Sequence, residues 1–458
     1  GATASRAVLF SGLTVVVALL GLVLVPDSIF RSLGVGAIIV TLLAVAAALT
    51  LLPAVLSLLG DKVNKGTIPF LGTKKSVDTP GGFWYRTTNV VMRHPLISAT
   101  ASVALLVAAS IPYFSLELGF NGIGTLPRDL EPRQAFDILD EEFSAGVVAP
   151  TEVVVAADDV NSPEVQRAVV RLSAELEGDE SFGNVTVERN ESGDLLVMSV
   201  ALNGDPDGDA AHSAIDRLRD EHIPSAFSGV EAQALVTGPT AQTADYVGMI
   251  NDFTPLVFVF VLGLSFFVLL LVFRSIVVPI KAIIMNLLSV GAAYGILVLV
   301  TVQGVGNEIF GFQQVDFIEA WLPLFMFAIL FGLSMDYHVF LLSRIRERFD
   351  ETGDNKEAVA YGVRSTAGII TGAALIMVAV FSGFAMGSLV SFQQMGFGLA
   401  IAVIIDATLI RTVLVPASMA LLGRWNWYLP SWLEWLPDVR VDRAAPAVQG
   451  AEAGAGAD

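Results

Sequence analysis

Two pairs of ionisable side chains stand inside long apolar runs of this 458-residue chain, and they are the first candidates for chemistry. Asp336 and the adjacent Tyr337 lie within the apolar run that begins near residue 322. Asp406 and Arg411 lie midway along the last apolar run. A charged side chain at the centre of a membrane-spanning helix costs about 2.5 to 3.5 kcal/mol, so such residues are functional candidates by default.

Reversible protonation is the chemistry that Asp336 could perform. Burial among apolar helices disfavours the ionised carboxylate, so a proton could bind and leave at physiological pH. The phenol of Tyr337 could donate a hydrogen bond to the carboxylate and help to relay the proton. Gly332, one helical turn earlier, shares the face of Asp336 and would let another helix approach closely. The alternative is a structural carboxyl group that is hydrogen-bonded to a neighbouring helix.

Asp406 and Arg411 are intramembrane polar partners whose role the sequence leaves open. A spacing of five residues places them about 140° apart around an α-helix, which argues against a direct ion pair. We expect each to contact polar groups on other helices or to be structural. His338 lies two residues from Asp336, nearly on the opposite face of the helix, and we expect it to be a bystander.

Enzyme chemistry and metal binding find no support in the sequence. The chain has no cysteine and only four histidines, which excludes disulfides, thiolate metal sites and cysteine nucleophiles. It contains no Walker A sequence, no Gly-x-Ser-x-Gly elbow and no His-Glu-x-x-His motif. We therefore expect no catalytic activity, no cofactor and no resident metal.

The composition predicts a polytopic α-helical membrane protein. Hydrophobic residues make up 54% of the chain, charged residues 16%, and the mean hydropathy is +0.68. A helix needs about 20 mostly apolar residues to cross a bilayer, and about eight runs satisfy this, at 7–25, 33–59, 95–115, 253–273, 278–302, 322–343, 366–386 and 394–422. Lys and Arg gather in the loops 61–94 and 344–364, which marks these loops as cytoplasmic. Counting helices then puts 116–252 on the outer side of the cytoplasmic membrane.

The segment 116–252 is predicted to be a separate acidic domain. Residues 120–252 hold 26 Asp and Glu against 7 Arg and no Lys, a net charge of −19 that equals the charge of the whole chain. This imbalance argues against nucleic acid as a partner. Strand and helix periodicities follow in the order β-α-β-β-α-β, the ferredoxin-like or split βαβ arrangement, at 152–157, 163–176, 184–189, 194–202, 209–222 and 232–237. A further helix from Thr240 is expected to lead directly into the membrane.

The first two membrane helices repeat the last two. Leu33-Gly34-Val35-Gly36 aligns with Met395-Gly396-Phe397-Gly398, and Leu52-Pro53-Ala54 aligns with Val415-Pro416-Ala417. Both copies would cross the membrane in the same direction, as parallel repeats do. We expect four further helices and a second external domain of the same protein upstream of Gly1.

The repeat defines the predicted domain organisation. Residues 1–60 are the last two helices of a first repeat, followed by a basic cytoplasmic linker at 61–94. The second repeat comprises a membrane helix at 95–115, the external domain at 116–252 and five membrane helices at 253–423. Residues 424–458 are expected to form an interfacial and disordered cytoplasmic tail, since four tryptophans stand between 425 and 435.

Three of these motifs together resemble a known family. They are Gly-Leu-Ser-Met-Asp-Tyr at 332–337, Phe-Leu-Leu-Ser-Arg at 340–344 and Ile-Asp-Ala-Thr-Leu-Ile-Arg at 405–411. They are similar to the second half of an MmpL transporter of the resistance-nodulation-division (RND) superfamily. The resemblance implies twelve membrane helices, two external porter domains and export of lipids or other hydrophobic molecules driven by proton entry. It assigns the proton relay to Asp336 and Tyr337, supported by hydroxyl groups at Ser11 and, through the repeat, Thr371.

Two alternative functions share the same superfamily. Sterol-sensing and Patched-like proteins resemble it too, so a non-transporting sensor is one alternative, and an accessory motor for protein export is the other. A buried Asp next to a Tyr favours ion coupling over a sensor. The expected partners are protons, membrane lipids or a hydrophobic small molecule, and the missing first half of the protein. A homo-oligomer is also compatible with the sequence.

Overall fold

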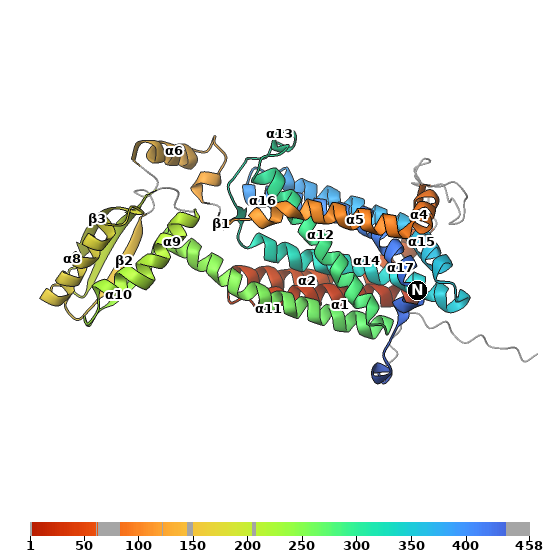
Figure 1. The fold of residues 1–458 in the computed structure, drawn as a ribbon. Helices are drawn as coiled ribbons and strands as arrows, with labels where there is room; N and C mark the ends of the chain where they lie inside the picture. The colour runs from red at the N-terminus through yellow and green to blue at the C-terminus, as the bar shows by residue number, and fades with distance from the viewer. Residues whose placement is uncertain are drawn as a thin grey trace, which may run out of the picture.

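A computed structural model describes residues 2–60, 62, 83–120, 122–143, 150–203 and 208–436. Long helices form a bundle, and an α/β domain projects from one end of it (Figure 1). Residues 63–82 of the predicted basic linker and residues 437–458 of the predicted tail lie outside the described residues. The described end of the linker is helical, because α4 spans Phe83–Arg93 and packs against α15.

Seven helices in the described ranges are long and apolar enough to cross a membrane. They are α2 with α3 (Ser28–Leu49 and Leu51–Leu59), α5 with the turn after it (Pro95–Ser110 and Ile111–Ser115), α11 (Pro239–Phe273), α12 (Val277–Thr301), α14 (Leu322–Thr352), α15 (Asn355–Ala385), and the last helix. This last helix consists of α16 (Val390–Ile405), a π-helix (Asp406–Leu414) and α17 (Val415–Leu422). The eighth expected helix is α1 (Ala2–Val23), whose part Ser11–Val23 is apolar. The prediction of a polytopic helical membrane protein is confirmed.

Two helix starts illustrate how the sequence sets these boundaries. The Asp27 carboxylate accepts hydrogen bonds from the backbone N–H groups of Ile29 and Phe30 and so caps α2. At the opposite end of the bundle, α14 ends at Gly353, whose φ of 69° a side chain would disfavour. Asp354 follows at once and caps α15 through the N–H groups of Lys356 and Glu357. A tight turn therefore joins α14 and α15.

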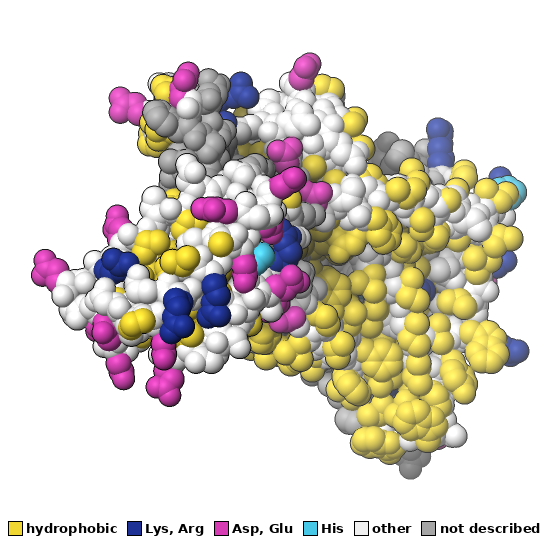
Figure 2. All heavy atoms as spheres, turned by 60° about the vertical axis from the view of Figure 1, so that its left-hand side comes forward, with side chains coloured by type: hydrophobic (Ala, Val, Ile, Leu, Met, Phe, Trp, Pro, Cys, Tyr) yellow, Lys and Arg dark blue, Asp and Glu magenta, His cyan; other side chains and the backbone are white. Residues whose placement is uncertain are grey.

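Helix α14 is the centre of the bundle, and α1, α11, α12, α15 and α16 pack around it. Phe327 on α14 is fully buried and stacks on Phe258 of α11, with 3.8 Å between the ring centroids. The predicted close approach at Gly332 is present, since a Cβ there would lie 3.3 Å from the Cα of Val15 on α1. By contrast, α2 and α3 expose apolar side chains such as Val40 at 65%. The surface of the bundle is correspondingly hydrophobic (Figure 2).

Local geometry follows the sequence repeat. Gly34 of α2 lies against Leu22 and the carbonyl of Leu19 on the preceding helix, α1. Gly396 of α16 lies in the same way against the backbone of Phe381 and Ala385 on the preceding helix, α15. The two copies also end alike, with φ and ψ of 47° and −132° at residue 60 and 53° and −127° at residue 423.

The projecting domain has the predicted ferredoxin-like topology. Its antiparallel sheet has the strand order β3-β4-β2-β5, with β2 at Thr151–Ala156, β3 at Phe182–Arg189, β4 at Leu195–Leu202 and β5 at Gln233–Thr237. The helices are α8 (Pro163–Glu177) and α9 (Asp209–Arg217), the latter continued by a π-helical turn (Leu218–His222) and α10 (Ile223–Ala226). Together they bury an apolar core that includes Val155, Leu172, Met198 and Ile215. Acidic side chains stand out on its surface (Figure 2).

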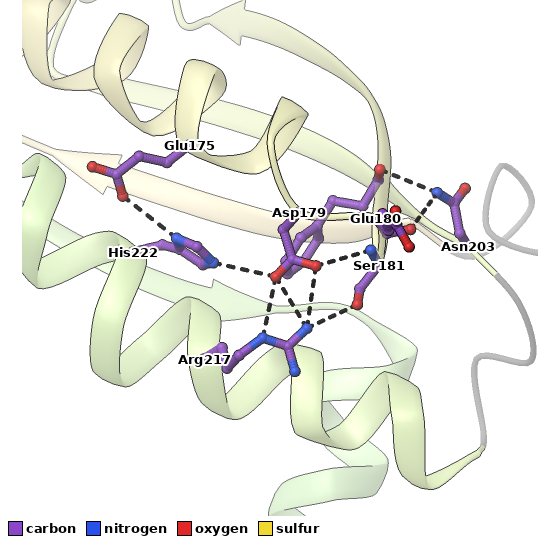
Figure 3. Close-up of polar contacts among 8 residues, drawn as sticks. Glu175, Asp179, Glu180, Ser181, Asn203, Arg217 and His222 are labelled. Carbon is purple, nitrogen blue, oxygen red and sulfur yellow. Dashed lines mark hydrogen bonds and ion pairs between the residues drawn. The ribbon is translucent and has the colours of Figure 1, made fainter.

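A polar cluster ties α8 to the α9 segment within this domain (Figure 3). Asp179 forms an ion pair of 3.0 Å with Arg217 and accepts a hydrogen bond of 2.9 Å from the backbone N–H of Ser181. His222 lies 3.4 Å from both Asp179 and Glu175. Partial burial alone raises the pKa of Asp179, but the hydrogen bonds from Ser181 and the contacts with Arg217 outweigh burial and lower that pKa to about 2.

The remaining elements join the domain to the bundle. Helix α6 (Glu131–Phe143) lies beside the domain, and α13 (Asn307–Phe310) lies at the end of the bundle nearest to it (Figure 1). The short strands β1 (Leu118–Gly119) and β6 (Ile318–Glu319) pair in parallel between the two. Helix α11 starts directly after β5 and continues as a membrane helix, as the sequence predicts.

Candidate functional site

The predicted relay residues lie on the central helix. The backbone of Asp336 is part of α14, one turn after Gly332, but its side chain lies outside the described residues. The hydroxyl of Tyr337 donates a hydrogen bond of 3.5 Å to the sulfur of Met377 on α15. The guanidinium of Arg411 lies over the Tyr337 ring, 4.3 Å from its centroid. The relay role of Asp336 and Tyr337 stays a prediction, and the structure adds Arg411 as a direct neighbour of Tyr337.

Asp406 and Arg411 form a buried ion pair. Nη2 and Nε of Arg411 lie 2.5 and 2.9 Å from the same carboxylate oxygen, Oδ2 of Asp406. Arg411 is only 2% exposed, and its Nη2 also donates to the carbonyl of Ser334 on α14 at 2.8 Å. The Ser334 hydroxyl completes the cluster by donating to Oδ1 of Asp406 at 3.0 Å. These contacts fasten the last helix to α14.

The expectation that residues 406 and 411 point apart is wrong. Residues five apart diverge on an α-helix, but Asp406–Leu414 is a π-helix, in which hydrogen bonds run from residue i to residue i+5. A turn of that width brings Asp406 and Arg411 to the same face. The other half of the expectation holds, because Arg411 also contacts a polar group on another helix.

A signal for the π-helix is present in the repeat. Nineteen residues lead from Gly34 to Pro53 in the first copy, and twenty lead from Gly396 to Pro416 in the second. The ends of both copies adopt the same local geometry, so the extra residue must be accommodated between them. In the first copy the helix is instead interrupted at Thr50, between α2 and α3.

His338 is buried beside this cluster, and its role as a bystander stays a prediction. Its ring is 1% exposed, and Nδ1 lies 3.0 Å from the carbonyl oxygen of Ser334 and 3.5 Å from its hydroxyl. A carbonyl only accepts, so Nδ1 carries the hydrogen in this contact. Asp406 and Arg411 also contact Ser334, so the cluster lies on the same face of α14 as His338, which is the face opposite Asp336.

Sequence reasoning also missed Ser334 and Asn286. Asn286 of α12 is buried and makes a short hydrogen bond with the Ser334 hydroxyl. That hydroxyl has one hydrogen, which it can donate either to Asn286 or to Asp406 but not to both. A polar amide within the apolar run 278–302 was the available signal. A pocket between α12, α14 and α16 has Asn286, Ser289, Ser334, Tyr337 and Asp406 on its wall.

The two hydroxyl groups that the resemblance assigns to relay support lie on either side of α14. Ser11 is on α1, which runs antiparallel to α14 (Figure 1), and Gly332 lies against Val15. Asp336 lies one turn after Gly332 and Ser11 lies one turn before Val15, so in this antiparallel pair the backbone of Asp336 is level with Ser11. Thr371 is on α15, donates to the Ala367 carbonyl at 2.7 Å, and shares a second pocket with Arg411.

Metal ligands do not gather in the described part of the chain. Among those residues no group of three or more His, Cys, Asp or Glu side chains could hold a metal ion. The charged cluster is instead balanced within the protein, one carboxylate against one guanidinium.

Comparisons with known proteins agree with the geometry. The model of the MMPL family matches residues 2–98 and 125–446. The mycolic acid-containing lipids exporter MmpL11 of Mycolicibacterium smegmatis is 36% identical over 457 residues, covering 98% of this chain and 47% of that protein. The heme uptake protein MmpL11 of Mycobacterium tuberculosis is 37% identical over 452 residues, covering 98% and 46%. The chain thus spans about half the length of these curated relatives.

A solved structure has the same fold. The hedgehog release protein Disp from a water bear, Hypsibius dujardini, aligns with a TM-score of 0.57 and covers 92% of this chain and 58% of that one. Its sequence is 14% identical, so the likeness concerns the fold alone.

Proposed function

The chain belongs to the MMPL family, and we propose that it is part of a transporter that exports lipids or other hydrophobic molecules across the cytoplasmic membrane, driven by proton entry. The observation that carries this proposal is the buried charged cluster of Asp406, Arg411 and Ser334 beside Tyr337. A cluster of this kind is costly inside an apolar bundle and has no catalytic or metal-binding geometry. Proton transfer is the use that fits its chemistry.

The proton relay in this proposal starts at Asp336 and Tyr337. Arg411 stacks on the Tyr337 ring and is paired with Asp406, so a change of charge at Asp336 is felt by the pair. Ser334 donates its single hydroxyl hydrogen to either Asn286 or Asp406, which gives the cluster two hydrogen-bonding arrangements. Moving one charge through the membrane potential is worth about 2.3 kcal/mol per 100 mV, enough to bias a conformational equilibrium of a few kcal/mol.

Helix α11 supports mechanical coupling between the bundle and the domain. Its 35 residues, with Pro255 inside the helix, run from the end of β5 through the membrane-spanning part, about 52 Å at 1.5 Å per residue. At the domain end, Thr240 and Ala241 are buried, and Ala241 belongs to the core of the domain. At the other end, Val257 and Val261 belong to the core of the bundle. A tilt of α11 in the membrane would therefore move the domain with it.

The orientation in this proposal follows from charge. The α14–α15 turn, which is flanked by Arg348 and Lys356, lies at the end of the bundle opposite the domain (Figure 1), so in this proposal that end faces the cytoplasm and the domain faces outward. Lipids are the proposed substrate class, because one relative is named as a lipid exporter and the surface of the bundle is apolar. Another relative is named for heme uptake, so heme is the competitor that an experiment has to include.

The test is transport by the intact protein in vesicles, with a fluorescent lipid on one side and a pH gradient across the membrane. We expect lipid movement that stops when the gradient is collapsed and that Asp336→Asn abolishes, because the amide mimics the neutral acid. Tyr361→Phe, at a ring on α15 that stacks with Arg348 of α14, is the matched control and should transport normally.

Four results would refute the proposal. Lipid movement that is indifferent to the gradient and to Asp336→Asn would remove the proton drive. Heme uptake without lipid movement would change the substrate class. Substrate binding with no movement at all would favour a sensor, and crosslinking to a translocon in place of lipid would favour a protein-export motor.

A further inference from the structure

The Asp406–Arg411 pair separates two pockets along the axis of the bundle. The first pocket includes Leu330 and Ala402, which precede the cluster on α14 and α16 and so lie toward the domain. The second pocket includes Leu341 and Thr412, which follow the cluster and so lie toward the opposite end. Ala407 lines both pockets, so the ion pair is the boundary between them.

The wall of the second pocket combines a hydrogen-bond donor from Arg411 with acceptors from three threonines. Nη1 of Arg411 is buried and has no hydrogen-bond partner among the described residues. The hydroxyls of Thr366, Thr371 and Thr412 also line the pocket, and each donates its hydrogen to a carbonyl of its own helix. Their oxygens therefore offer only lone pairs to the pocket. The lining of this pocket thus combines one guanidinium group with three hydroxyl groups.

Water is the molecule that satisfies both sets of groups. It would accept a hydrogen bond from Nη1 of Arg411 and donate its own two hydrogens to threonine oxygens. A buried water needs two to four polar partners and about 10–15 Å³ of space, and this pocket supplies the partners and about 10 Å³, the room of one water molecule. An anion would be repelled by the hydroxyl lone pairs, and a cation by the guanidinium. An apolar ligand would leave Nη1 of Arg411 unsatisfied, which costs about 1–3 kcal/mol.

We propose that the pocket between α4, α14, α15 and the π-helix holds water that connects Arg411 with the cytoplasmic end of the bundle. The pocket extends to Trp84 on α4, next to Tyr85, whose ring lies under the guanidinium of Arg364. The basic residues at this end mark it as the cytoplasmic side. This inference rests on the proposed function for its purpose: the water is the inward branch of the proton path, and the pocket on the domain side is the outward branch.

Thiol labelling tests the pocket directly, because the natural chain has no cysteine. Thr371→Cys and Thr366→Cys place a thiol on the pocket wall, while Ile369→Cys places one at the same depth on the exposed apolar face of α15. A small cationic methanethiosulfonate reagent is added to inverted vesicles that contain the full-length protein. We expect the two pocket thiols to react at least about tenfold faster than the Ile369→Cys thiol, since only the thiolate reacts and an apolar surrounding suppresses its formation.

Filling the pocket provides the complementary variant. Ala367→Leu, on the same wall, should slow the labelling of Thr366→Cys and Thr371→Cys without affecting Ile369→Cys. Two thiol positions are used so that one variant that fails to insert does not remove the test. Equal labelling of pocket and control positions, or no effect of Ala367→Leu, overturns the inference.

The labelling result separates this inference from the proposed function. Proton flux into the same vesicles is measured with an internal pH dye, in the presence and absence of Thr371→Val, which removes an acceptor at constant volume. Absence of proton flux in the unmodified protein would refute the proposed function. The labelling rates would still show whether the pocket holds water. Proton flux together with slow labelling of Thr366→Cys and Thr371→Cys would refute the water pathway and leave the proposed function standing. Fast labelling with a flux that Thr371→Val slows severalfold supports both.

Discussion

Arg411 and Asp406 form an ion pair across five residues of one helix, with 2.5 Å between Nη2 and Oδ2, because the helix widens to a π-helix between them. The pair has little exposure to solvent, and each partner has a further contact on α14. Its net contribution to stability is small, because removing two charges from water offsets their attraction. Removing only one of the two partners should lower stability much more, since one uncompensated charge would remain buried.

Replacing one partner of the pair should therefore lower the free energy of unfolding more than replacing both. We expect Arg411→Met to lower the free energy of unfolding by about 3–5 kcal/mol, because Asp406 is left buried without its partner. The double variant Arg411→Met with Asp406→Leu should recover much of this loss. Thermal unfolding of the purified full-length protein measures both. A double variant that is no more stable than the single one would show that the loss does not come from an unpaired Asp406.

Removing one residue from the π-helix should separate the pair without changing either side chain. Deleting Thr408 restores the spacing found in the first copy of the repeat, so we expect α-helical hydrogen bonding and an Arg411 turned away from Asp406. Proton-coupled transport should be lost while membrane insertion is retained. Thr408→Ala keeps the residue count and is the control, which should transport normally. Normal transport by the deletion variant would contradict a role for the π-helix.

The fold could be predicted from the sequence, because it depends on local patterns. Alternation of apolar residues located the strands of the domain to within two residues, as for β5 at Gln233–Thr237 against 232–237. The polar cluster could not be predicted in the same way. It depends on contacts between distant segments, such as Asn286 with Ser334. It also depends on a π-helix, whereas the expectation from the sequence assumed the α-helical rotation of about 100° per residue. Only the changed spacing between repeat copies carried that information.

The contact at Gly332 should tolerate no larger side chain. A Cβ at this position lies 3.3 Å from the Cα of Val15, which is backbone and cannot rotate away. We expect Gly332→Val to push α1 from α14 and to lower stability by about 1–3 kcal/mol. Gly263→Ala in α11 is the matched control, because nothing lies within 4 Å of a Cβ there. Unchanged thermal stability of Gly332→Val would show that α1 is not held against α14.

The domain should lose stability in acid through Asp179. Its pKa is about 2 in the folded domain against 3.8 for a free side chain, so the stabilisation is fully present above pH 4 and is lost as the pH falls from 3.8 toward 2. Pepsin cleavage of the full-length protein within 150–237 should accelerate over this interval. Asp179→Asn should be cleaved faster already at pH 4 and respond less to further acid. Glu191→Gln, at an exposed turn, should behave like the unmodified protein.

The domain should be accessible from outside the cell and the α14–α15 turn from the cytoplasm. Lys and Arg are retained on the cytoplasmic side of membrane proteins, and the turn between α14 and α15 is flanked by Arg344, Arg346, Arg348 and Lys356, whereas residues 120–252 contain no lysine. An impermeant thiol reagent applied to whole cells should label Glu191→Cys and leave Lys356→Cys unlabelled until the cells are opened. Both positions are exposed, so a difference between them reports the side of the membrane and not burial. Labelling of Lys356→Cys in intact cells, with Glu191→Cys protected, would invert the orientation, and protons moving inward would then meet the pocket at Thr371 before the pocket at Ser334.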